Sequence, residues 1–234
     1  MQAIILAGGK GRRLLPYTTV LPKPLMPIGD YPILEVILIQ LVKSGFDDII
    51  ISTGHLGELI QAYLKGRNDL DLPIRFSQES EPLGTIGPLH LIDDLEETFL
   101  VMNGDILTDI DYQSVIRYHK EHHACATVAT YQRDAKIDFG VLERNAENKI
   151  ICFREKPVYH FDVSMGIYVF DKTVLSYVPE KKPFGFDDLM YALVDRSEAV
   201  YSYPYDGYWL DIGRPDDYET AIVEFEKNAN KFLK

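Results

Sequence analysis

The segment IILAGGKGRRLLPYTTVLPKPLMPIG, residues 4–29, contains the strongest structural signal in the sequence. A short apolar run, typical of a buried strand, ends in Gly8, Gly9 and Gly11. Glycines in this position let backbone N–H groups approach a phosphate, because no Cβ lies in the way. Two arginines follow at once, and Lys23 stands between two prolines. The segment therefore predicts a strand followed by a loop with enough positive charge to bind a triphosphate.

Two common phosphate-binding motifs do not fit this segment. A Walker A loop requires G-x-x-x-x-G-K-[ST], which the sequence lacks. A Rossmann fingerprint requires a third glycine and a following helix, but Leu14 occupies the third glycine position and Pro16 precedes any helix. Taken alone, the glycines could also form a simple turn that joins a strand to an irregular connection.

The chain has 234 residues, with 46% hydrophobic and 26% charged residues, which is ordinary for a globular protein that folds in water. Its net charge of −12 argues against a nucleic-acid partner, which would require a basic surface. The two cysteines, Cys125 and Cys152, are too few for a disulfide framework, so we expect reduced, buried thiols.

The beginning of the sequence does not resemble a secretory signal, since Gly8 follows the first apolar residues too soon. No stretch approaches the roughly 20 apolar residues of a membrane span. We therefore expect a cytoplasmic protein that does not enter a membrane.

Strand-like and helix-like segments alternate through the first half of the chain. Strands are predicted at 3–6, 48–53, 74–78, 99–102 and 126–131, and helices at 33–44, 56–65, 83–95 and 112–122. Asp30 is the expected N-cap of the first helix. This alternation predicts an α/β fold: a Rossmann-like, mostly parallel sheet with helices on both faces. Ligands of such sheets bind beyond the carboxyl ends of the strands, where residues 8–13, 78–84 and 103–105 would meet.

The second half of the chain has shorter strand-like segments separated by turn residues. We predict strands at 140–142, 150–154 and 165–170, extended segments at 201–204 and 208–210, and helices at 187–196 and 215–228. This pattern favours a small antiparallel extension. We expect residues 1–234 to form one domain, with a nucleotide-binding half at about 1–110 and a second-substrate half at about 111–234.

The sequence closely resembles the sugar-phosphate nucleotidyltransferases, the nucleotide-sugar pyrophosphorylases. Their signature, L-A-G-G-x-G-x-R-L-x-P-x-T followed by P-K-P-L-x-P-I, is matched at every fixed position: Leu6, Ala7, Gly8, Gly9, Gly11, Arg13, Leu14, Pro16, Thr18, Pro22, Lys23, Pro24, Leu25, Pro27 and Ile28. The resemblance implies the nucleotide-diphospho-sugar transferase fold. It also implies the Mg²⁺-assisted reaction of an NTP with a sugar 1-phosphate to give an NDP-sugar and pyrophosphate.

The negative charge of both substrates determines which residues this reaction would need. Two polyanions must meet, so cations and alignment matter more than a covalent nucleophile. Arg13 can hold the β- and γ-phosphates with its planar guanidinium, and Lys23 offers a point charge, so we assign both as catalytic. Asp105 and Asp211 match the family's two metal-binding aspartates, in N-G-D and W-x-D-x-G, and carboxylates suit Mg²⁺. The neighbouring Asp109 would be a solvated charge or a cap.

The resemblance also assigns the sugar phosphate and the nucleotide to different segments. Lys156 and Glu155 match the family's E-K-P motif, where they hold the sugar phosphate and the sugar hydroxyls, and Gly140 matches [YF]-G-V. Ser164 stands where the family usually has asparagine, which puts the identity of the sugar in doubt. The predicted nucleotide-binding residues are Leu6, Ala7, Gly8, Gly9, Gly11, Gln78, Gly84 and Thr85, although Gln78 could also be structural.

The segment E-P-L-G-T-x-G-P-L, residues 81–89, resembles that of mannose-1-phosphate guanylyltransferases more than that of thymidylyltransferases, and uridylyltransferases share its E-P-L-G-T part. GTP with a mannose- or heptose-like sugar 1-phosphate is therefore the leading interpretation. Uridylyl, thymidylyl or cytidylyl transfer, phosphocholine as the acceptor, and a non-catalytic nucleotide-binding regulatory subunit of the same fold stay open, as does a homo-oligomer.

Two further clusters have simpler interpretations. His119, His122 and His123 are expected to be exposed histidines near the end of a helix rather than a metal site. The aromatic cluster Tyr201, Tyr203, Tyr205 and Tyr208 is expected to pack on a strand rather than to stack on bases.

Overall fold

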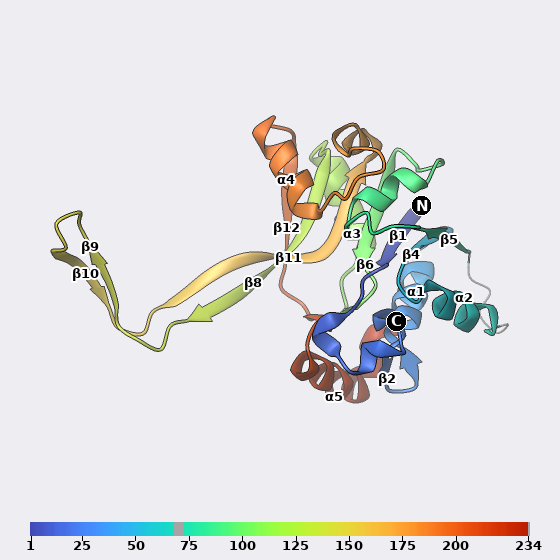
Figure 1. The fold of residues 1–234 in the computed structure, drawn as a ribbon, viewed down its shortest axis with the longest axis horizontal. Coiled ribbons are helices and arrows are strands. Elements are labelled where there is room, and N and C mark those ends of the chain that lie inside the picture. The colour runs from blue at the N-terminus through green and yellow to red at the C-terminus, as the bar shows by residue number, and fades with distance from the viewer. Residues whose placement is uncertain (68–72, 234) are drawn as a thin grey trace.

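A central mixed β-sheet organises the computed structural model, which describes residues 1–67 and 73–233 (Figure 1). Within those ranges the sheet has seven strands, in the spatial order β12 (Val200–Tyr205), β8 (Ala126–Lys136), β11 (Val158–Asp171), β6 (Thr98–Asn103), β1 (Gln2–Ala7), β4 (Asp48–Thr53) and β5 (Ile74–Gln78). β1 lies parallel to both β4 and β6, and β4 lies parallel to β5. β12 also lies parallel to β8. Among these described strands, only β11 is antiparallel to its neighbours, β6 and β8. The predicted mostly parallel sheet is therefore confirmed.

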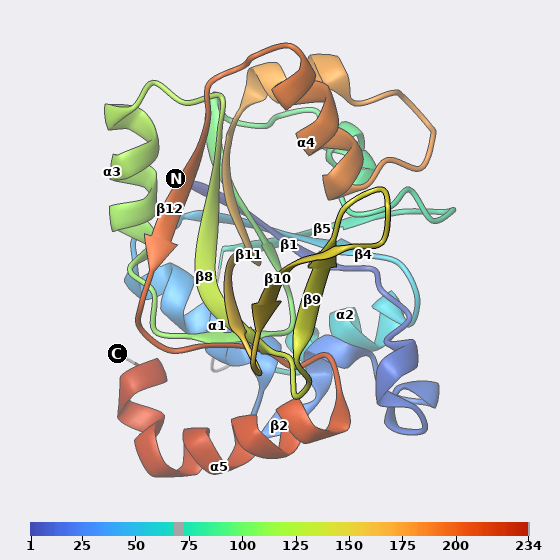
Figure 2. The same ribbon diagram turned by 90° about the vertical axis from the view of Figure 1, so that its left-hand side faces the viewer.

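Helices cover both faces of the sheet, as predicted (Figure 2). Ile4 and Ile5 are fully buried and point to opposite faces, as successive strand residues must. One face packs against helices α1 (Ile33–Lys43), α2 (Gly57–Lys65), α3 (Tyr112–Glu121) and α5 (Pro215–Phe232). The other face packs against α4 (Phe186–Asp195) and the 3₁₀ helices η4 (Gly87–Leu91) and η5 (Lys172–Tyr177).

The predicted helix over residues 83–95 is wrong, because only the short 3₁₀ helix η4 forms there. Gly84 has a left-handed φ of +83° and lies against the backbone of Phe184. The amides of Ile86 and Gly87 donate to the Phe184 carbonyl oxygen, at 3.0 and 3.1 Å, rather than to a preceding turn of α-helix. Long-range backbone contacts thus override the local helical pattern.

The start of α1 also differs from the prediction. Asp30 does not cap the helix; Pro32 occupies the N-cap position, and no side chain caps the helix there. The short strands β2 (Pro27–Ile28) and β3 (Tyr31–Pro32) pair with each other just before it. The Ile33 amide donates to the Met26 carbonyl oxygen at 3.1 Å, so the backbone supplies the acceptor that we expected from a side chain.

Strands β8 and β11 are longer than predicted, and they continue beyond the sheet as a two-stranded antiparallel ribbon (Figure 1). Its outer end carries the hairpin of β9 (Val141–Arg144) and β10 (Ile150–Arg154). We call residues 132–163 the arm. The antiparallel extension is confirmed, and it projects away from the body.

Another antiparallel pair joins β7 (Ile106–Thr108) to β13 (Trp209–Asp211). This pairing places the segment around Asp211 beside the segment that follows Asp105, although the two lie about a hundred positions apart in the sequence. No helix among the described residues is both long enough and apolar enough to cross a membrane.

Three predictions of side-chain environment met different outcomes. Cys125 and Cys152 are free, but each is partly exposed rather than buried: Cys125 lies just before β8, and Cys152 lies on β10 of the projecting hairpin. His119 is only 1% exposed, which contradicts its predicted exposure: α3 turns this side chain toward Thr127 of β8. Packing is confirmed for Tyr203, Tyr205 and Tyr208 of the tyrosine cluster, which lie against the core, whereas Tyr201 is 38% exposed.

Candidate active site

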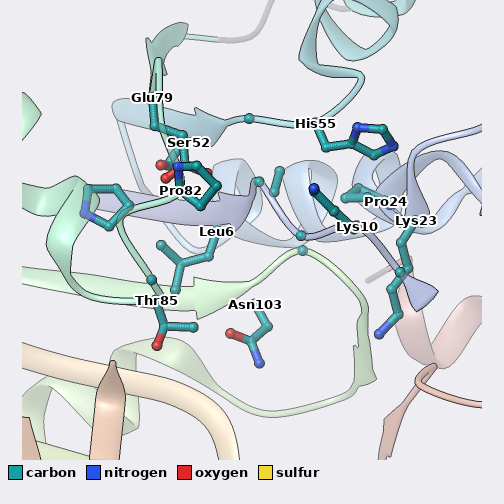
Figure 3. Close-up of a pocket in the computed structure, with 18 of the residues that line it drawn as sticks. Leu6, Lys10, Lys23, Pro24, Ser52, His55, Glu79, Pro82, Thr85 and Asn103 are labelled. Atoms are coloured by element: carbon teal, nitrogen blue, oxygen red, sulfur yellow. The ribbon is translucent and has the colours of Figure 1, made fainter. Parts of the chain in front are cut away.

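A cleft of about 1020 Å³ opens beyond the carboxyl ends of β1, β4, β5 and β6 (Figure 3). Its walls come from segments that are distant in the sequence, at residues 6–13, 23–24, 52–55, 78–88 and 103–105. The cleft is lined by all the predicted nucleotide-binding residues and by three of the predicted catalytic and metal-binding ones: Leu6, Ala7, Gly8, Gly9, Gly11, Gln78, Gly84, Thr85, Arg13, Lys23 and Asp105. The structure therefore brings these residues, which the sequence assigns to separate segments, together in one cleft.

The glycine loop passes directly from β1 to the short 3₁₀ helix η1 (Arg12–Leu14). Gly11 has a left-handed φ of +59°, and a Cβ there would lie 2.7 Å from Cγ2 of Thr18. The Thr18 hydroxyl donates to the Gly11 carbonyl oxygen at 2.8 Å and holds the turn. The amides of Gly9, Lys10 and Gly11 donate no backbone hydrogen bond within the described part of the chain. Free amides in a glycine turn are suited to binding phosphate oxygens.

Lys23 forms the centre of a charged cluster in the cleft. Its Nζ donates to Asp105 Oδ2 and lies 3.4 Å from Asp211 Oδ1. An Arg13 guanidinium nitrogen lies 4.0 Å from Asp211 Oδ2. The 3₁₀ helix η3 (Lys23–Leu25) begins at the lysine, and the flanking prolines restrict its backbone. Two carboxylates and two cations therefore meet where the glycine loop ends.

Asp105 is the more buried of the two carboxylates, with its side chain 16% exposed against 40% for Asp211. Burial raises the pKa of its carboxyl against the positive charge of Lys23, and the negative Asp211 raises it further. Its Oδ1 atom is buried and has no hydrogen-bond partner among the described residues. An unpartnered carboxylate oxygen beside a second carboxylate is a suitable ligand for a hard cation.

The described residues contain no cluster of three or more His, Cys, Asp or Glu side chains that could hold a metal. Mg²⁺ does not need such a cluster, because substrate phosphates and water complete its shell around one or two carboxylates. Asp105 and Asp211 therefore fit this cation together with a bound phosphate substrate.

The opposite wall of the cleft is formed by the segment after β5. Glu79 fills the space beside the glycine loop, since a Cβ on Gly8 or on Gly54 would lie 2.6 or 2.4 Å from its Oε1. Its Oε2 accepts from the Leu83 amide at 2.9 Å, which fixes the loop before Gly84. The Thr85 hydroxyl accepts from the Phe186 amide at 2.9 Å. The loop over residues 78–85 is thus held to the glycine loop on one side and to α4 on the other.

Some residues of the cleft were given no role from the sequence, although Lys10, Glu79 and Asn103 lie within the predicted rim segments, whereas His55 lies outside them. Lys10 and His55 line one side in Figure 3, and Glu79 and Asn103 line other parts of the wall. Lys10 occupies the variable position between the signature glycines, so no motif marks it. Asn103 directly precedes Gly104 and Asp105 at the end of β6, and its place on that predicted rim was the available signal.

The predicted sugar-phosphate residues lie in two different places. Gly140, Glu155 and Lys156 are on the arm, outside the cleft of their own chain. They are close to one another there, because a Cβ on Gly140 would lie 3.2 Å from Glu155 Oε2. Ser164 lies where the arm meets the sheet; its hydroxyl donates to the Tyr168 hydroxyl oxygen and accepts from the Gly166 amide, each at 3.2 Å.

Comparison with known proteins agrees with this geometry. The model of the family described as nucleotidyl transferase matches residues 2–228. The chain is 34% identical to a UTP–glucose-1-phosphate uridylyltransferase of Synechocystis and 32% identical to a mannose-1-phosphate guanyltransferase of Candida albicans. These matches cover 95% and 99% of the chain, which spans only 62% and 66% of the length of those relatives.

A solved structure, HddC from Yersinia pseudotuberculosis, superposes with a TM-score of 0.76 at 26% identity. The match covers 96% of this chain and 99% of HddC. The structure of HddC complexed with GMP-PN superposes with a TM-score of 0.73.

Proposed function

We propose, since the chain belongs to the nucleotidyl transferase family, that it transfers a nucleotidyl group from an NTP to a sugar 1-phosphate and releases pyrophosphate. The observation that carries the proposal is the charged cluster of the cleft. Lys23 contacts both Asp105 and Asp211, and it lines the same cleft as a glycine loop with free amides. A simple nucleotide binder has little use for two converging carboxylates, whereas transfer between two phosphates requires controlled charge at that point.

In this reaction an oxygen of the sugar phosphate attacks the α-phosphorus of the NTP. The new oxygen–phosphorus bond forms as the bond between the α-phosphorus and the bridging oxygen breaks, and that oxygen leaves with pyrophosphate. The amides of residues 9–11 and the Arg13 guanidinium would bind the β- and γ-phosphates, and thereby align the leaving group. Lys23 would offer its positive charge to the reacting phosphates.

Asp105 and Asp211 would hold Mg²⁺, which supplies charge neutralisation at the phosphate oxygens when it is bound. Lys23 contacts both carboxylates in the structure described here. We expect its ammonium group to turn toward phosphate when a cation occupies the carboxylates, because one flexible side chain can serve either anion.

For the substrates, we propose GTP and a mannose- or heptose-like sugar 1-phosphate. The resemblance of residues 81–89 to guanylyltransferases, the Candida albicans relative and the complex of HddC with GMP-PN support this choice. The Synechocystis relative is named for UTP and glucose 1-phosphate, so uridylyl transfer is the principal competing specificity.

A pyrophosphate-release assay tests the reaction. Each of the four NTPs is combined with mannose, glucose and heptose 1-phosphates and with phosphocholine, in the presence of Mg²⁺. We expect release above background only with matched pairs, and fastest with GTP. No release with any pair, alongside tight nucleotide binding, would favour a regulatory nucleotide-binding role instead.

Lys156→Ala separates the two substrates. If Lys156 holds the sugar phosphate, the substitution removes one charge-assisted contact, and KM for the sugar phosphate should rise at least about tenfold. KM for the NTP should stay within about twofold. Lys149→Ala, on the same arm, serves as the matched control. A rise confined to the KM of the NTP would contradict the assignment of Lys156.

A further inference from the structure

The arm exposes an unusual amount of apolar surface for a segment surrounded by water. Eight of its large apolar side chains are at least 37% exposed: Ile137, Phe139, Leu142, Ile150, Ile151, Phe153, Val158 and Phe161. Figure 1 shows the arm projecting from the body, with the β9–β10 hairpin at its far end. So many exposed apolar side chains on one projecting segment indicate an interaction site.

The direction of the arm is fixed by the sheet from which it emerges. β8 and β11 continue into it past a register shift between Ser164 and Tyr168, and beyond the shift Ser164 pairs with Thr130 and Val158 with Lys136. β12 supports β8 as far as Tyr131, which pairs with Tyr205.

Aromatic contacts also hold the root of the arm. The Arg133 guanidinium lies 5.0 Å from the Trp209 ring and 5.5 Å from the Tyr131 ring. The Trp209 indole N–H donates to the Met165 carbonyl oxygen at 2.9 Å. Bending the arm toward the cleft of its own chain would disrupt these contacts and part of the ladder.

This geometry separates Lys156 from the cleft of the same chain. Gly166 lies beside the cleft, because a Cβ on it would lie 2.5 Å from Nδ2 of Asn103, which lines the cleft. The strand from Val158 to Ser164 leads outward from that point, and seven extended residues span about 20 Å. Lys156 lies beyond its outer end.

We propose that the arm docks on a second copy of this chain and delivers Glu155 and Lys156 to the cleft of that copy. The inference rests on the proposed function, in which those two residues bind the sugar phosphate. Because the cleft of its own chain lies out of reach, the arm can meet a matching cleft only on another copy of the chain. A reciprocal exchange also covers both arms at once, as expected for a symmetric dimer.

The distribution of charge along the chain also favours a second copy of the chain as the partner of the arm. The arm has six Lys or Arg and six Asp or Glu residues, so the rest of the chain carries the whole net charge of −12. Two acidic bodies repel each other, whereas a neutral arm with Arg154, Lys156 and exposed apolar residues can approach an acidic body without that cost.

The mass of the protein in solution tests the docking itself. Light scattering at micromolar concentration should give twice the chain mass of 26.7 kDa. Phe139→Ser combined with Phe161→Ser should shift the protein to the monomer, because these side chains are 78% and 53% exposed and contribute little to the fold of one chain. Tyr191→Ser, which removes an exposed aromatic of α4, is the matched control and should remain dimeric. A wild-type monomer throughout would overturn the proposal.

Mixing two impaired variants tests the delivery of Lys156, since at subsaturating sugar phosphate each should have at most about a tenth of the wild-type rate. Lys156→Ala damages the arm, and Asp211→Asn damages the cleft. After subunit exchange at equal amounts, half of the dimers pair the two variants, and each such dimer has one site with an intact arm and an intact cleft. Activity should therefore return to about a quarter of the wild-type rate at subsaturating sugar phosphate. No recovery, with mixed dimers confirmed by native mass spectrometry, would show that each arm serves its own chain.

A cross-linking measurement separates the failure of this inference from the failure of the proposed function, because it needs no turnover. Protein labelled with ¹⁵N is exchanged with unlabelled protein and treated with a lysine-reactive cross-linker. Lys156 should join Lys10, which lines the cleft, in peptide pairs of mixed isotope. Pairs with only one isotope would contradict delivery between chains, whatever reaction the cleft performs.

Discussion

At the scale of single residues, the glycines of the cleft differ in how strictly the structure requires them. Gly84 has a left-handed φ of +83°, and a Cβ there would lie 2.6 Å from the Phe184 carbonyl oxygen. Gly9 has open space around it, since no heavy atom beyond its own residue and its two chain neighbours lies within 4 Å of its ideal Cβ. The sequence predicts Gly9 in a loop and Gly84 near the start of a helix, and only the structure shows that Gly84 supports the fold through its contact with Phe184.

This difference gives a matched pair of variants. Gly84→Ala should lower the free energy of unfolding by roughly 2 kcal/mol or more, from the left-handed backbone together with the overlap on Phe184. Gly9→Ala should change it by less than about 1 kcal/mol. Chemical denaturation measures both values. Equal losses in the two variants would contradict the backbone contact between Gly84 and Phe184.

At the scale of elements, the periodic segments were predictable and the irregular ones were not. The strands at 48–53 and 74–78 and the helix near 33–44 follow directly from runs of apolar residues. The helix predicted at 83–95 was wrong because the apolar residues there have helical spacing, whereas the backbone amides of Ile86 and Gly87 donate to Phe184. The length of the arm was also hidden, since β8 changes from buried to exposed residues midway and local pattern does not show where the sheet ends.

The packing of α3 on the sheet leads to a prediction about pH. His119 is buried against β8, and its Nε2 lies 3.1 Å from Asp171 Oδ1. A carboxylate only accepts, so the neutral ring donates from Nε2, and its Nδ1 accepts from the Thr127 hydroxyl at 2.9 Å. Burial lowers the pKa of His119 from its ordinary value of 6.5, against the opposing effect of Asp171. The unfolded chain therefore binds a proton at a higher pH than the folded chain does.

The sign of the effect follows from this difference in proton binding. Above pH 6.5 the neutral His119 makes its full contribution to the free energy of unfolding. As the pH falls below 6.5, protonation of the unfolded chain removes this contribution. We expect the free energy of unfolding to decrease between pH 7.5 and pH 5.5. His119→Gln, whose amide can replace both hydrogen bonds, should show a smaller decrease over the same interval. An unchanged slope in the variant would remove His119 as the cause.

At the scale of the whole molecule, the site combines what the sequence can and cannot specify. The signature residues predicted a nucleotide cleft, and the parallel sheet explains why residues 8–13, 78–85 and 103–105 meet there. The pairing of β13 with β7 places Asp211 beside Asp105, which no local pattern could indicate without the family resemblance. The position of Lys156 on a projecting arm depends on the whole architecture, and it makes the assembly part of the proposed site.

The central claim is that the cluster of Lys23, Asp105 and Asp211 carries nucleotidyl transfer, and the rate of pyrophosphate formation by carboxylate variants tests it most directly. Asp105→Asn and Asp211→Asn keep the shape of each side chain but remove its charge. We expect each to lower kcat at least about 100-fold with Mg²⁺ and the best substrate pair, because each loses several kcal/mol of stabilisation of the reacting phosphates. Asp216→Asn, an exposed residue in the first turn of α5, is the control and should keep the wild-type rate. Near-normal rates in Asp105→Asn and Asp211→Asn would contradict the account.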